Sequence, residues 1–478
     1  MLQFLRNCKL HPFLISLYPL LALASWNYGF IIWSDVFRSF SVIIIIVTIL
    51  LFLLYLIQRS FARASLEVSL ISIFFFFYVP LLRWVFTLGI RVEFYELAVI
   101  LITILCATIW IICLWTVIRS KKQFEGLTVF LNTASLVLIT SLLLHLGWMD
   151  LQSNGAKRSV LQNAPSLSVS RQQASNQRPD IYYIILDGYT REDVFREDFS
   201  YDNSGFTSSL QSQGFFVANN SYSNYGKTVL SIASSLNFDY LTPVTTGTIG
   251  EELNFSVYRE FINQNRVMQF LKQQGYEIIA IESGYNITEV QNSDLYVDFP
   301  PSINNAEMMF LENSFSLLFI ENWIPANKRA RLLKSFASLE ELSSRPSPKF
   351  VFLHVLAMHS PFLFDRNGAP LDPGVPEYEG YKEQVLFINQ LVQETVSTIL
   401  ENSENEPVII LQGDHGPATD VGSVGIQECG KDHFSILNAI RLPSNSGAAF
   451  YDELSPVNTF RLVFNTVFGT DLGVFHLS

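Results

Sequence analysis

The stretch PVIILQGDHG at residues 407–416 decides the fold of the larger part of this chain. Its run of β-branched and other apolar residues is typical of a buried strand, and the run leads directly into an acidic residue and an imidazole. Two other stretches share this pattern, IYYIILDG at 181–188 and FVFLHVLAMHSPF at 350–362. In open α/β sheets ligands bind beyond the carboxyl ends of the strands, so the three stretches predict a site along one sheet edge.

Longer amphipathic stretches separate these strands. We expect helices near 203–213, from 228, and over 256–274, 381–402 and 455–468, with two more strands at 276–282 and 434–442. Strands rich in Ile, Val and Phe that alternate with helices are typical of a mostly parallel sheet buried on both faces. About 300 residues suffice for one large core, so residues 179–478 are predicted to form a single α/β domain.

The first 149 residues have a different character. Apolar stretches lie at roughly 12–33, 40–57, 65–86, 94–118 and 125–148. Each is near the length of about 20 residues that crosses a bilayer as a helix. We therefore expect an α-helical transmembrane bundle of five spans over residues 1–149. Residues 150–178 are rich in Ser, Gln and Asn and are predicted to be a flexible linker.

Charge divides the chain at the same place. Residues 1–149 contain 10 Lys and Arg against 5 Asp and Glu, whereas the remainder contains 21 against 38. The acidic second part would repel a polyphosphate backbone, which argues against nucleic acid as a partner. The N-terminal segment and the second and fourth expected loops carry seven Lys and Arg, and the other two loops carry two. The positive-inside rule then predicts a multi-pass protein of the plasma (inner) membrane with a cytoplasmic N-terminus and an extracytoplasmic C-terminal domain.

The strand ends supply candidate metal ligands. Asp187 follows the first strand, His359 follows the strand at 350–357, and Asp414 and His415 follow the strand at 407–412. Carboxylate oxygens and imidazole nitrogens are ligands of Zn²⁺ and Mn²⁺. An Asp-Gly pair by itself is more often a plain turn, so the prediction depends on the groups occurring together.

The segment SNYGKT at 223–228 precedes an expected helix. Thr228 would lie at the helix N-terminus, where free N–H groups and the helix dipole favour a phosphate, although a simple N-cap gives the same pattern. A nucleotide-binding P-loop is excluded because Ser221 stands where that motif needs glycine. Lys227 is expected either to contact a phosphate oxygen or to remain in solvent.

Two further histidines also have a structural as well as a functional interpretation. His354 lies in the middle of a strand, and an offset of five residues from His359 would place it on the opposite face if the strand continued, so we predict a core histidine. For His433 the sequence allows two roles, a contact with the substrate or a purely structural one.

These motifs resemble the sulfatase-like branch of the alkaline phosphatase superfamily. The resemblance rests on four segments: the strand with Asp187-Gly188, Asn-Tyr-Gly-Lys-Thr at 224–228, His-Ser-Pro-Phe at 359–362 and Gly-Asp-His-Gly at 413–416. The layout of spans followed by an outer domain is similar to lipoteichoic acid synthases and bacterial phosphoethanolamine transferases. The resemblance implies that Asp187, Thr228, Asp414 and His415 bind one divalent metal, Mn²⁺ or Zn²⁺, with Mg²⁺ as a further candidate.

The resemblance also implies that Thr228 is the nucleophile and that His359 contacts the substrate phosphate or the leaving group. Lys227 and His433 are the other candidate substrate-binding residues. Asp187 stands where these transferases usually have Glu, which changes the cavity. The C/S-x-P-x-R pattern of arylsulfatases is absent around Thr228, which argues against formylglycine-type sulfatase activity.

The resulting expectation is a metal-dependent membrane transferase. It would move a phosphoglycerol- or phosphoethanolamine-type group from a phospholipid donor to an envelope glycan or lipid acceptor through a phosphothreonine intermediate. The alternatives are a phosphodiesterase or phosphatase with the same site, in which water replaces the acceptor, and a catalytically silent envelope assembly protein.

Overall fold

The computed structural model describes residues 2–87, 95–120, 124–163, 178–241, 255–299, 303–320, 323–417, 430–444, 447 and 450–475. The chain forms two compact units. The first contains Met1–Gly155 together with Ser302–Ile324, and the second contains Ala156–Pro301 together with Pro325–Ser478. The domain boundaries at 149 and 178 stay a prediction.

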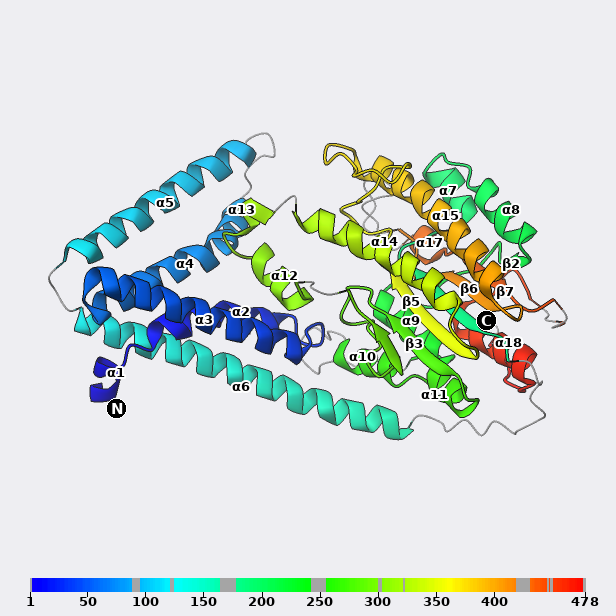
Figure 1. Cartoon of the computed structure of the whole chain (residues 1–478), viewed down its shortest axis with the longest axis horizontal. Coiled ribbons are helices and arrows are strands. Elements are labelled where there is room, and N and C mark those ends of the chain that lie inside the picture. Colours follow the sequence, from blue (N-terminus) through cyan, green and yellow to red (C-terminus); the bar gives the residue numbers. More distant parts are fainter. Residues whose placement is uncertain are drawn as a thin grey trace. The chain divides into compact units, whose positions relative to one another are not determined.

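The first unit is helical (Figure 1). Its elements are α1 (Leu2–Asn7), α2 (His11–Trp26), α3 (Trp33–Gln58), α4 (Phe61–Phe86), α5 (Tyr95–Arg119), the first part of α6 (Glu125–Asn163), α12 (Asn305–Glu312) and α13 (Leu317–Ile320). Among the described residues, four helices are long and apolar enough to cross a membrane, namely those from Trp33, Phe61, Leu97 and Glu125. The expected bundle of apolar helices followed by an α/β domain is therefore confirmed.

Two of the expected helical boundaries differ from the structure. The first expected span, 12–33, is the 16-residue helix α2, which at 1.5 Å per residue is shorter than a full bilayer crossing because the chain turns after Trp26. Helix α6 runs on to Asn163, through the start of the expected linker, where no proline interrupts it before residue 165. The rest of that linker, 164–177, lies outside the described residues.

The second unit contains a seven-stranded sheet in the order β2-β7-β6-β1-β5-β3-β4. The strands are β1 (Ile181–Leu186), β2 (Phe215–Val217), β3 (Glu277–Ile281), β4 (Leu295–Val297), β5 (Lys349–Val355), β6 (Val408–Gly413) and β7 (Asn438–Arg441). The central strand β1 pairs in parallel with β5 and β6, and β3 continues the parallel ladder beyond β5. Strand β7 is antiparallel to β6 and to β2. The prediction of a mostly parallel sheet is confirmed.

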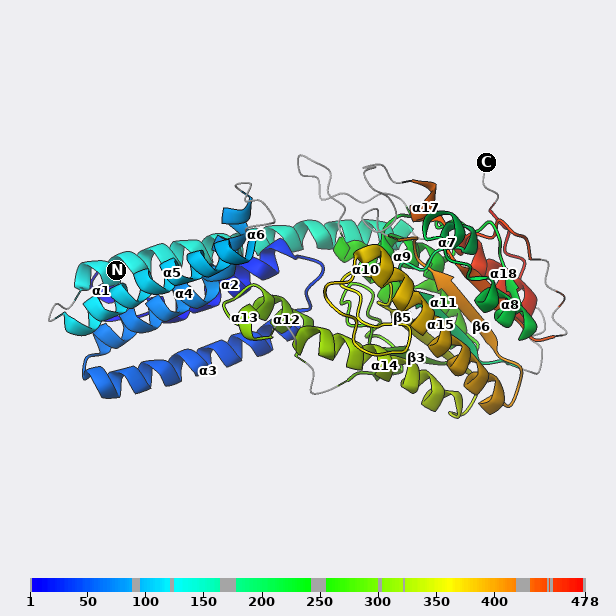
Figure 2. The same ribbon diagram turned by 90° about the horizontal axis from the view of Figure 1, so that it is seen from above.

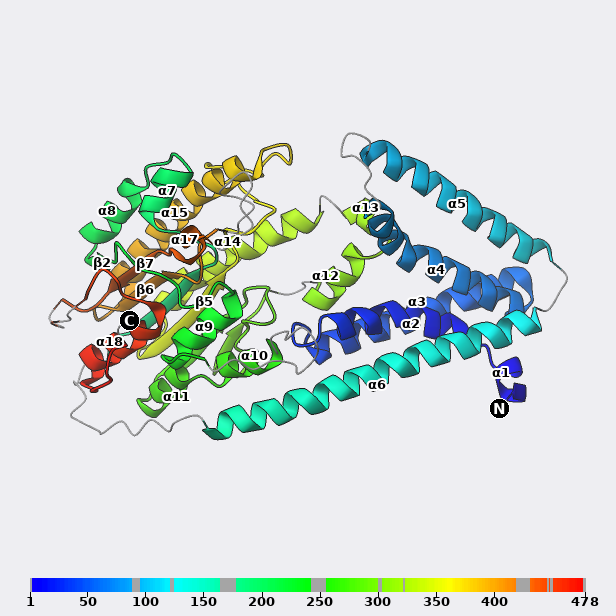
Figure 3. The same ribbon diagram turned by 180° about the vertical axis from the view of Figure 1, so that it is seen from behind.

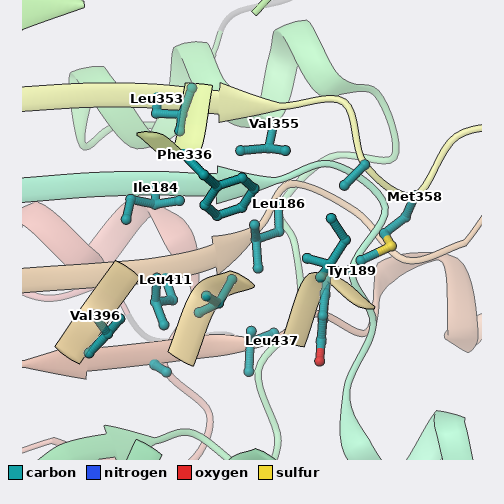
Figure 4. Close-up of a cluster of buried hydrophobic side chains, with 14 of the residues drawn as sticks. Ile184, Leu186, Tyr189, Phe336, Leu353, Val355, Met358, Val396, Leu411 and Leu437 are labelled. Atoms are coloured by element: carbon teal, nitrogen blue, oxygen red, sulfur yellow. The ribbon is translucent and has the colours of Figure 1, made fainter. Parts of the chain in front are cut away.

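Helices cover both faces of this sheet, as Figures 2 and 3 show. They are α7 (Glu192–Asp198), α8 (Ser204–Ser212), α9 (Thr228–Asn237), α10 (Phe255–Asn263), α11 (Arg266–Gln273), α14 (Trp323–Ser343), α15 (Glu377–Asn402), α17 (Lys431–Phe434) and α18 (Pro456–Phe468). On one face Ile184, Leu353 and Leu411 pack with Phe336 of α14 and Val396 of α15 in the main core (Figure 4). On the other face the Tyr183 ring meets Phe460 of α18 with 5.0 Å between the ring centroids. Strands buried on both faces explain the near-continuous apolar runs in the sequence.

Most expected elements of this unit are present, with local differences. The single helix expected over 256–274 is broken into α10 and α11, because the Asn265 side chain caps the second helix by accepting from Met268 N at 2.8 Å. The strand expected from 434 begins only at Asn438, after the short helix α17. Strands β2 and β4 have three residues each and gave no periodic signal in the sequence.

Candidate active site

Three adjacent strands, β6, β1 and β5, deliver the predicted ligands to one edge of the sheet. Asp187 directly follows β1, Asp414 directly follows β6, and His359 lies four residues beyond β5. Parallel pairing in register, with Leu186 opposite both Val355 and Gly413, brings the three strand ends to the same level. Gly188 adopts a left-handed backbone with φ of 71°, which lets the chain turn away immediately after Asp187.

The Asp187 carboxylate is the centre of the cluster. It is 1% exposed, and its Oδ2 atom accepts from His354 Nε2 at 3.1 Å. Its Oδ1 atom lies 3.3 Å from His359 Nε2 and 3.7 Å from His415 Nε2, yet has no hydrogen-bond partner of acceptable geometry. A buried carboxylate oxygen without a partner is costly, so this atom is available for a cation.

Asp414 and His415 approach the same point from β6. Asp414 Oδ1 accepts from Gly188 N at 3.0 Å, whereas Oδ2 has no hydrogen-bond partner and lies 3.4 Å from His415 Nε2. The other ring nitrogen of His415, Nδ1, donates to the carbonyl of Gly416 at 2.7 Å, which leaves Nε2 with its lone pair. His415 Nε2 therefore faces two unpartnered carboxylate oxygens as a potential ligand.

Thr228 completes this arrangement as the first residue of α9. Its hydroxyl Oγ1 lies 3.2 Å from His415 Nε2, and its side chain is buried. The preceding loop is fixed to the Asp414 backbone, because Ser223 Oγ donates to the Asp414 carbonyl. The structure thus brings together Asp187, Thr228, His359, Asp414 and His415.

The two remaining predicted residues lie at the rim. The His433 ring stacks on His415 with 5.0 Å between centroids, and its Nε2 lies 2.8 Å from the Gly226 carbonyl in the loop before Thr228. Gly226 is needed there, since a Cβ atom would come within 2.9 Å of that ring. Lys227 is exposed, and its Nζ lies 5.5 Å from the centroid of the Phe255 ring. His433 therefore packs against the site, while Lys227 points to a neighbouring aromatic side chain.

The electrostatics of the cluster favour an ionised Asp187. Burial opposes ionisation of Asp187, but the hydrogen bond from His354 and the nearby His359 imidazole outweigh it and hold its pKa well below the usual range. The close Asp187 carboxylate raises the pKa of His359 to about 9. Burial lowers the pKa of His415, but the charges of Asp414 and Asp187 outweigh this and raise it overall. The Asp187 carboxylate therefore stays ionised at neutral pH, and its charge favours a cation.

The residues present fit a divalent metal. Two groups of side chains place their ligand atoms within 4.8 Å of one another, Asp187 with His359 and His415, and Asp187 with His354 and Asp414. The donor set of carboxylate oxygens and imidazole nitrogens suits both Zn²⁺ and Mn²⁺. The unpartnered atoms Asp187 Oδ1 and Asp414 Oδ2 are the observation that a bound cation would explain.

Sequence reasoning missed the place of His354 in this cluster. Its side chain is fully buried, with Nε2 on Asp187 and Nδ1 2.9 Å from Thr288 Oγ1. It belongs to the interior, as predicted, but it contacts the same carboxylate as His359. The alternation argument does not apply, because β5 ends at Val355 and the chain turns before His359. The spacing of two histidines around a strand end was the available signal.

Comparisons with known proteins identify the family of the second unit. The sulfatase family matches residues 179–452, which is more than half of the chain. Among solved structures, the periplasmic domain of EptC from Escherichia coli in complex with Zn is 13% identical with a TM-score of 0.44, covering 64% of this chain and 86% of that one. No curated protein matches the chain.

Two similar structures are described as membrane or envelope enzymes. Lipoteichoic acid synthase LtaP from Listeria monocytogenes is 16% identical with a TM-score of 0.42, covering 67% of this chain and 78% of that one. The integral membrane lipooligosaccharide phosphoethanolamine transferase A (EptA) from Neisseria meningitidis is 13% identical with a TM-score of 0.42, covering 97% and 95%. On the family match, the chain belongs to the sulfatase family. Helices that are long and apolar enough to cross a membrane precede the sulfatase domain in the sequence.

Proposed function

We propose that this protein is a metal-dependent membrane phosphotransferase that uses Thr228 as its nucleophile. The observation that carries the proposal is the position of the Thr228 hydroxyl, at a helix N-terminus and 3.2 Å from an imidazole nitrogen that faces two unpartnered carboxylate oxygens. A lone threonine hydroxyl is a poor nucleophile, and this surrounding is what would activate it.

Each residue has a distinct part in the proposed reaction. Asp187, Thr228, Asp414 and His415 would hold the divalent metal. When bound, the metal supplies positive charge that favours the ionised hydroxyl and offsets charge on the phosphoryl oxygens. The first backbone N–H groups of α9 point out of the N-terminal end of the helix and stabilise the same phosphoryl oxygens. Because the His359 side chain is 51% exposed, it can reach a leaving group and donate a proton to it.

The proposed reaction has two steps. In the first, the Thr228 hydroxyl loses its proton to solvent, Oγ1 bonds to the phosphorus of a phospholipid, the bond from phosphorus to the diacylglycerol oxygen breaks, and that oxygen takes a proton from His359. In the second, a hydroxyl of an envelope glycan or lipid gives its proton to His359, its oxygen bonds to phosphorus, the bond from phosphorus to Thr228 Oγ1 breaks, and Oγ1 takes a proton from solvent. The transferred group is of the phosphoglycerol or phosphoethanolamine type. We place the N-terminus in the cytoplasm and the sulfatase domain outside the plasma membrane, as the loop charges predict.

The test is turnover of a labelled phospholipid by the full chain in detergent, with Mn²⁺ or Zn²⁺ added. We expect release of diacylglycerol that depends on the metal and on an added glycan or lipid acceptor, and that is lost in Thr228→Ala. Thr207→Ala is a matched control, since both threonine residues are 8% exposed and Thr207 bonds to Glu192 outside the cluster. Full activity in Thr228→Ala would contradict the proposal.

The same assay separates the alternative functions. Turnover that proceeds without any acceptor and yields a free phosphate ester would indicate the hydrolase. Absence of both turnover and bound metal would indicate the silent assembly protein. Both results would contradict the transferase.

A further inference from the structure

The helical unit contains an apolar cavity of about 500 Å³ between α2, α3, α4 and α12. Its lining includes Val42, Ile46 and Leu50 of α3, Phe75 and Phe76 of α4, and Phe310 of α12. The volume is within the range of about 300–1,000 Å³ that is typical of ligand pockets. Val42 and Ile46 are 47% and 50% exposed, so the cavity opens along the outer face of a helix that is long enough to span a membrane.

Helix α12 is firmly built into this wall although its sequence follows β4 of the sulfatase domain. The Phe310 ring packs on Phe76 with 4.8 Å between centroids. Just beyond the helix, the backbone N–H of Phe315 donates to the carbonyl of Phe75 at 2.7 Å. Arg83 donates to Asn313 at 2.6 Å. These contacts make the cavity a defined feature of the helical unit.

Away from Glu307 at one end, the cavity offers nothing that would retain water. Three serine hydroxyls line it, and each donates to a carbonyl of its own helix: Ser16 to Pro12 at 2.7 Å, Ser39 to Asp35 at 3.1 Å and Ser72 to Val68 at 2.9 Å. A buried water needs two to four polar partners, so an occupant must be hydrocarbon. In a membrane, an opening on the outer face of a helix meets lipid acyl chains. The available hydrocarbon is therefore an acyl chain.

The charged end of the cavity fits a lipid phosphate. Glu307 is the one charged residue among its described lining, and Arg38 pairs with both of its oxygens, Nε with Oε1 at 2.7 Å and Nη2 with Oε2. The Arg38 side chain remains 53% exposed, one helical turn before Val42. An exposed guanidinium at the mouth is the natural partner of the phosphate that every glycerophospholipid carries.

We propose that this cavity holds one acyl chain of a glycerophospholipid, with the lipid phosphate at Arg38. That the bound lipid is the donor of the reaction rests on the proposed function; that the cavity binds a lipid does not. In the sequence, α12 lies between two elements of the sulfatase domain, β4 and α14. It is then the part of this stretch that contacts the lipid in the helical unit.

The test is photo-crosslinking of the full chain in vesicles that contain phosphatidylethanolamine with a photoreactive group midway along one acyl chain. The protein carries Thr228→Ala, so that binding is measured without turnover. We expect adducts on α12, within 305–312, as well as on α3. Ile46→Trp should fill the opening and lower the α12 adduct by about tenfold, the factor that about 1.4 kcal/mol produces.

Ile45→Trp is the matched control, because Ile45 is 57% exposed on the same helix and is not among the lining residues. It should leave the α12 adduct unchanged, and Arg38→Gln should lower it. If Ile46→Trp does not fold, Val42→Phe replaces it. Equal α12 adducts in the Ile45 and Ile46 variants, or adducts on α3 alone, would show contact with bulk lipid only and overturn the proposal. Adducts together with no diacylglycerol release by the unsubstituted enzyme would instead contradict the proposed function while the lipid site remains.

Discussion

The pair His354 and Thr288 gives the sharpest prediction about how the site is supported. Thr288 Oγ1 lies 2.9 Å from His354 Nδ1, and His354 Nε2 lies 3.1 Å from Asp187 Oδ2, so a threonine orients a histidine that orients a carboxylate. Thr288→Val keeps the shape of the side chain and removes the hydroxyl. We expect the metal affinity to fall about 10–100-fold, the usual effect of losing an outer partner of a metal ligand.

The same substitution should also affect stability. It leaves His354 Nδ1 buried without a partner, which costs about 1–3 kcal/mol in the free energy of unfolding. Thr395→Val is the matched control, because both threonine residues are 1% exposed and Thr395 donates to Glu340 at 3.1 Å, away from the site. The loss of stability should be similar in the two variants, while metal affinity should fall in Thr288→Val alone.

The assay is calorimetric titration of Mn²⁺ or Zn²⁺ into chelator-treated protein, together with denaturant unfolding of the metal-free forms. Equal metal affinity in the two variants would refute the reasoning, because His354 would then be a packing residue that happens to touch Asp187. A lower affinity in both variants would indicate a general loss of structure.

Three further predictions concern stability. Removal of the metal by a chelator should lower the unfolding temperature, because a ligand at 100 times its Kd adds about 2.7 kcal/mol to the native state; an unchanged melting curve would contradict a metal site. Asp180→Ala should cost about 3–5 kcal/mol in denaturant unfolding, since it leaves the fully buried Lys349 ammonium without its carboxylate partner, and a cost below 1 kcal/mol would show that the pair is unimportant. Burial and the neighbouring Asp432 raise the pKa of Asp198 from 3.8 to about 6, so ionisation of Asp198 costs more in the folded state and its contribution to stability is lost as the pH rises from about 4 to about 6. Asp198→Asn should remove this part of the pH dependence. If the free energy of unfolding changes with pH in the same way in both proteins, this contribution of Asp198 is excluded.

The sheet and its site edge could be predicted because the information is local. The runs at 181–186 and 408–411 are apolar on both faces, and the polar residues that follow each run can only lie at its carboxyl end. Parallel pairing then places Asp187 and Asp414 side by side without any knowledge of the long connections between them. The helix at Thr228 was predictable from the apolar run that follows it.

The remaining features depend on contacts between distant parts of the chain. The contact of His354 with the same carboxylate as His359 follows from where β5 stops and the chain turns, which alternation along one strand cannot show. The segment Ser302–Ile324 groups with the helical unit although it lies within the sequence of the sulfatase domain. Its apolar residues face α3 and α4, and in isolation they resemble the core face of any short amphipathic helix.

The most direct measurement of the central claim is the mass of the peptide that contains Thr228, after the full chain has been incubated with phospholipid and metal in the absence of acceptor. The account predicts an added substituted phosphoryl group on Thr228, which disappears when an acceptor is supplied and is absent in Thr228→Ala. Turnover of the phospholipid with an unmodified Thr228, or with the added mass on another residue, would contradict it.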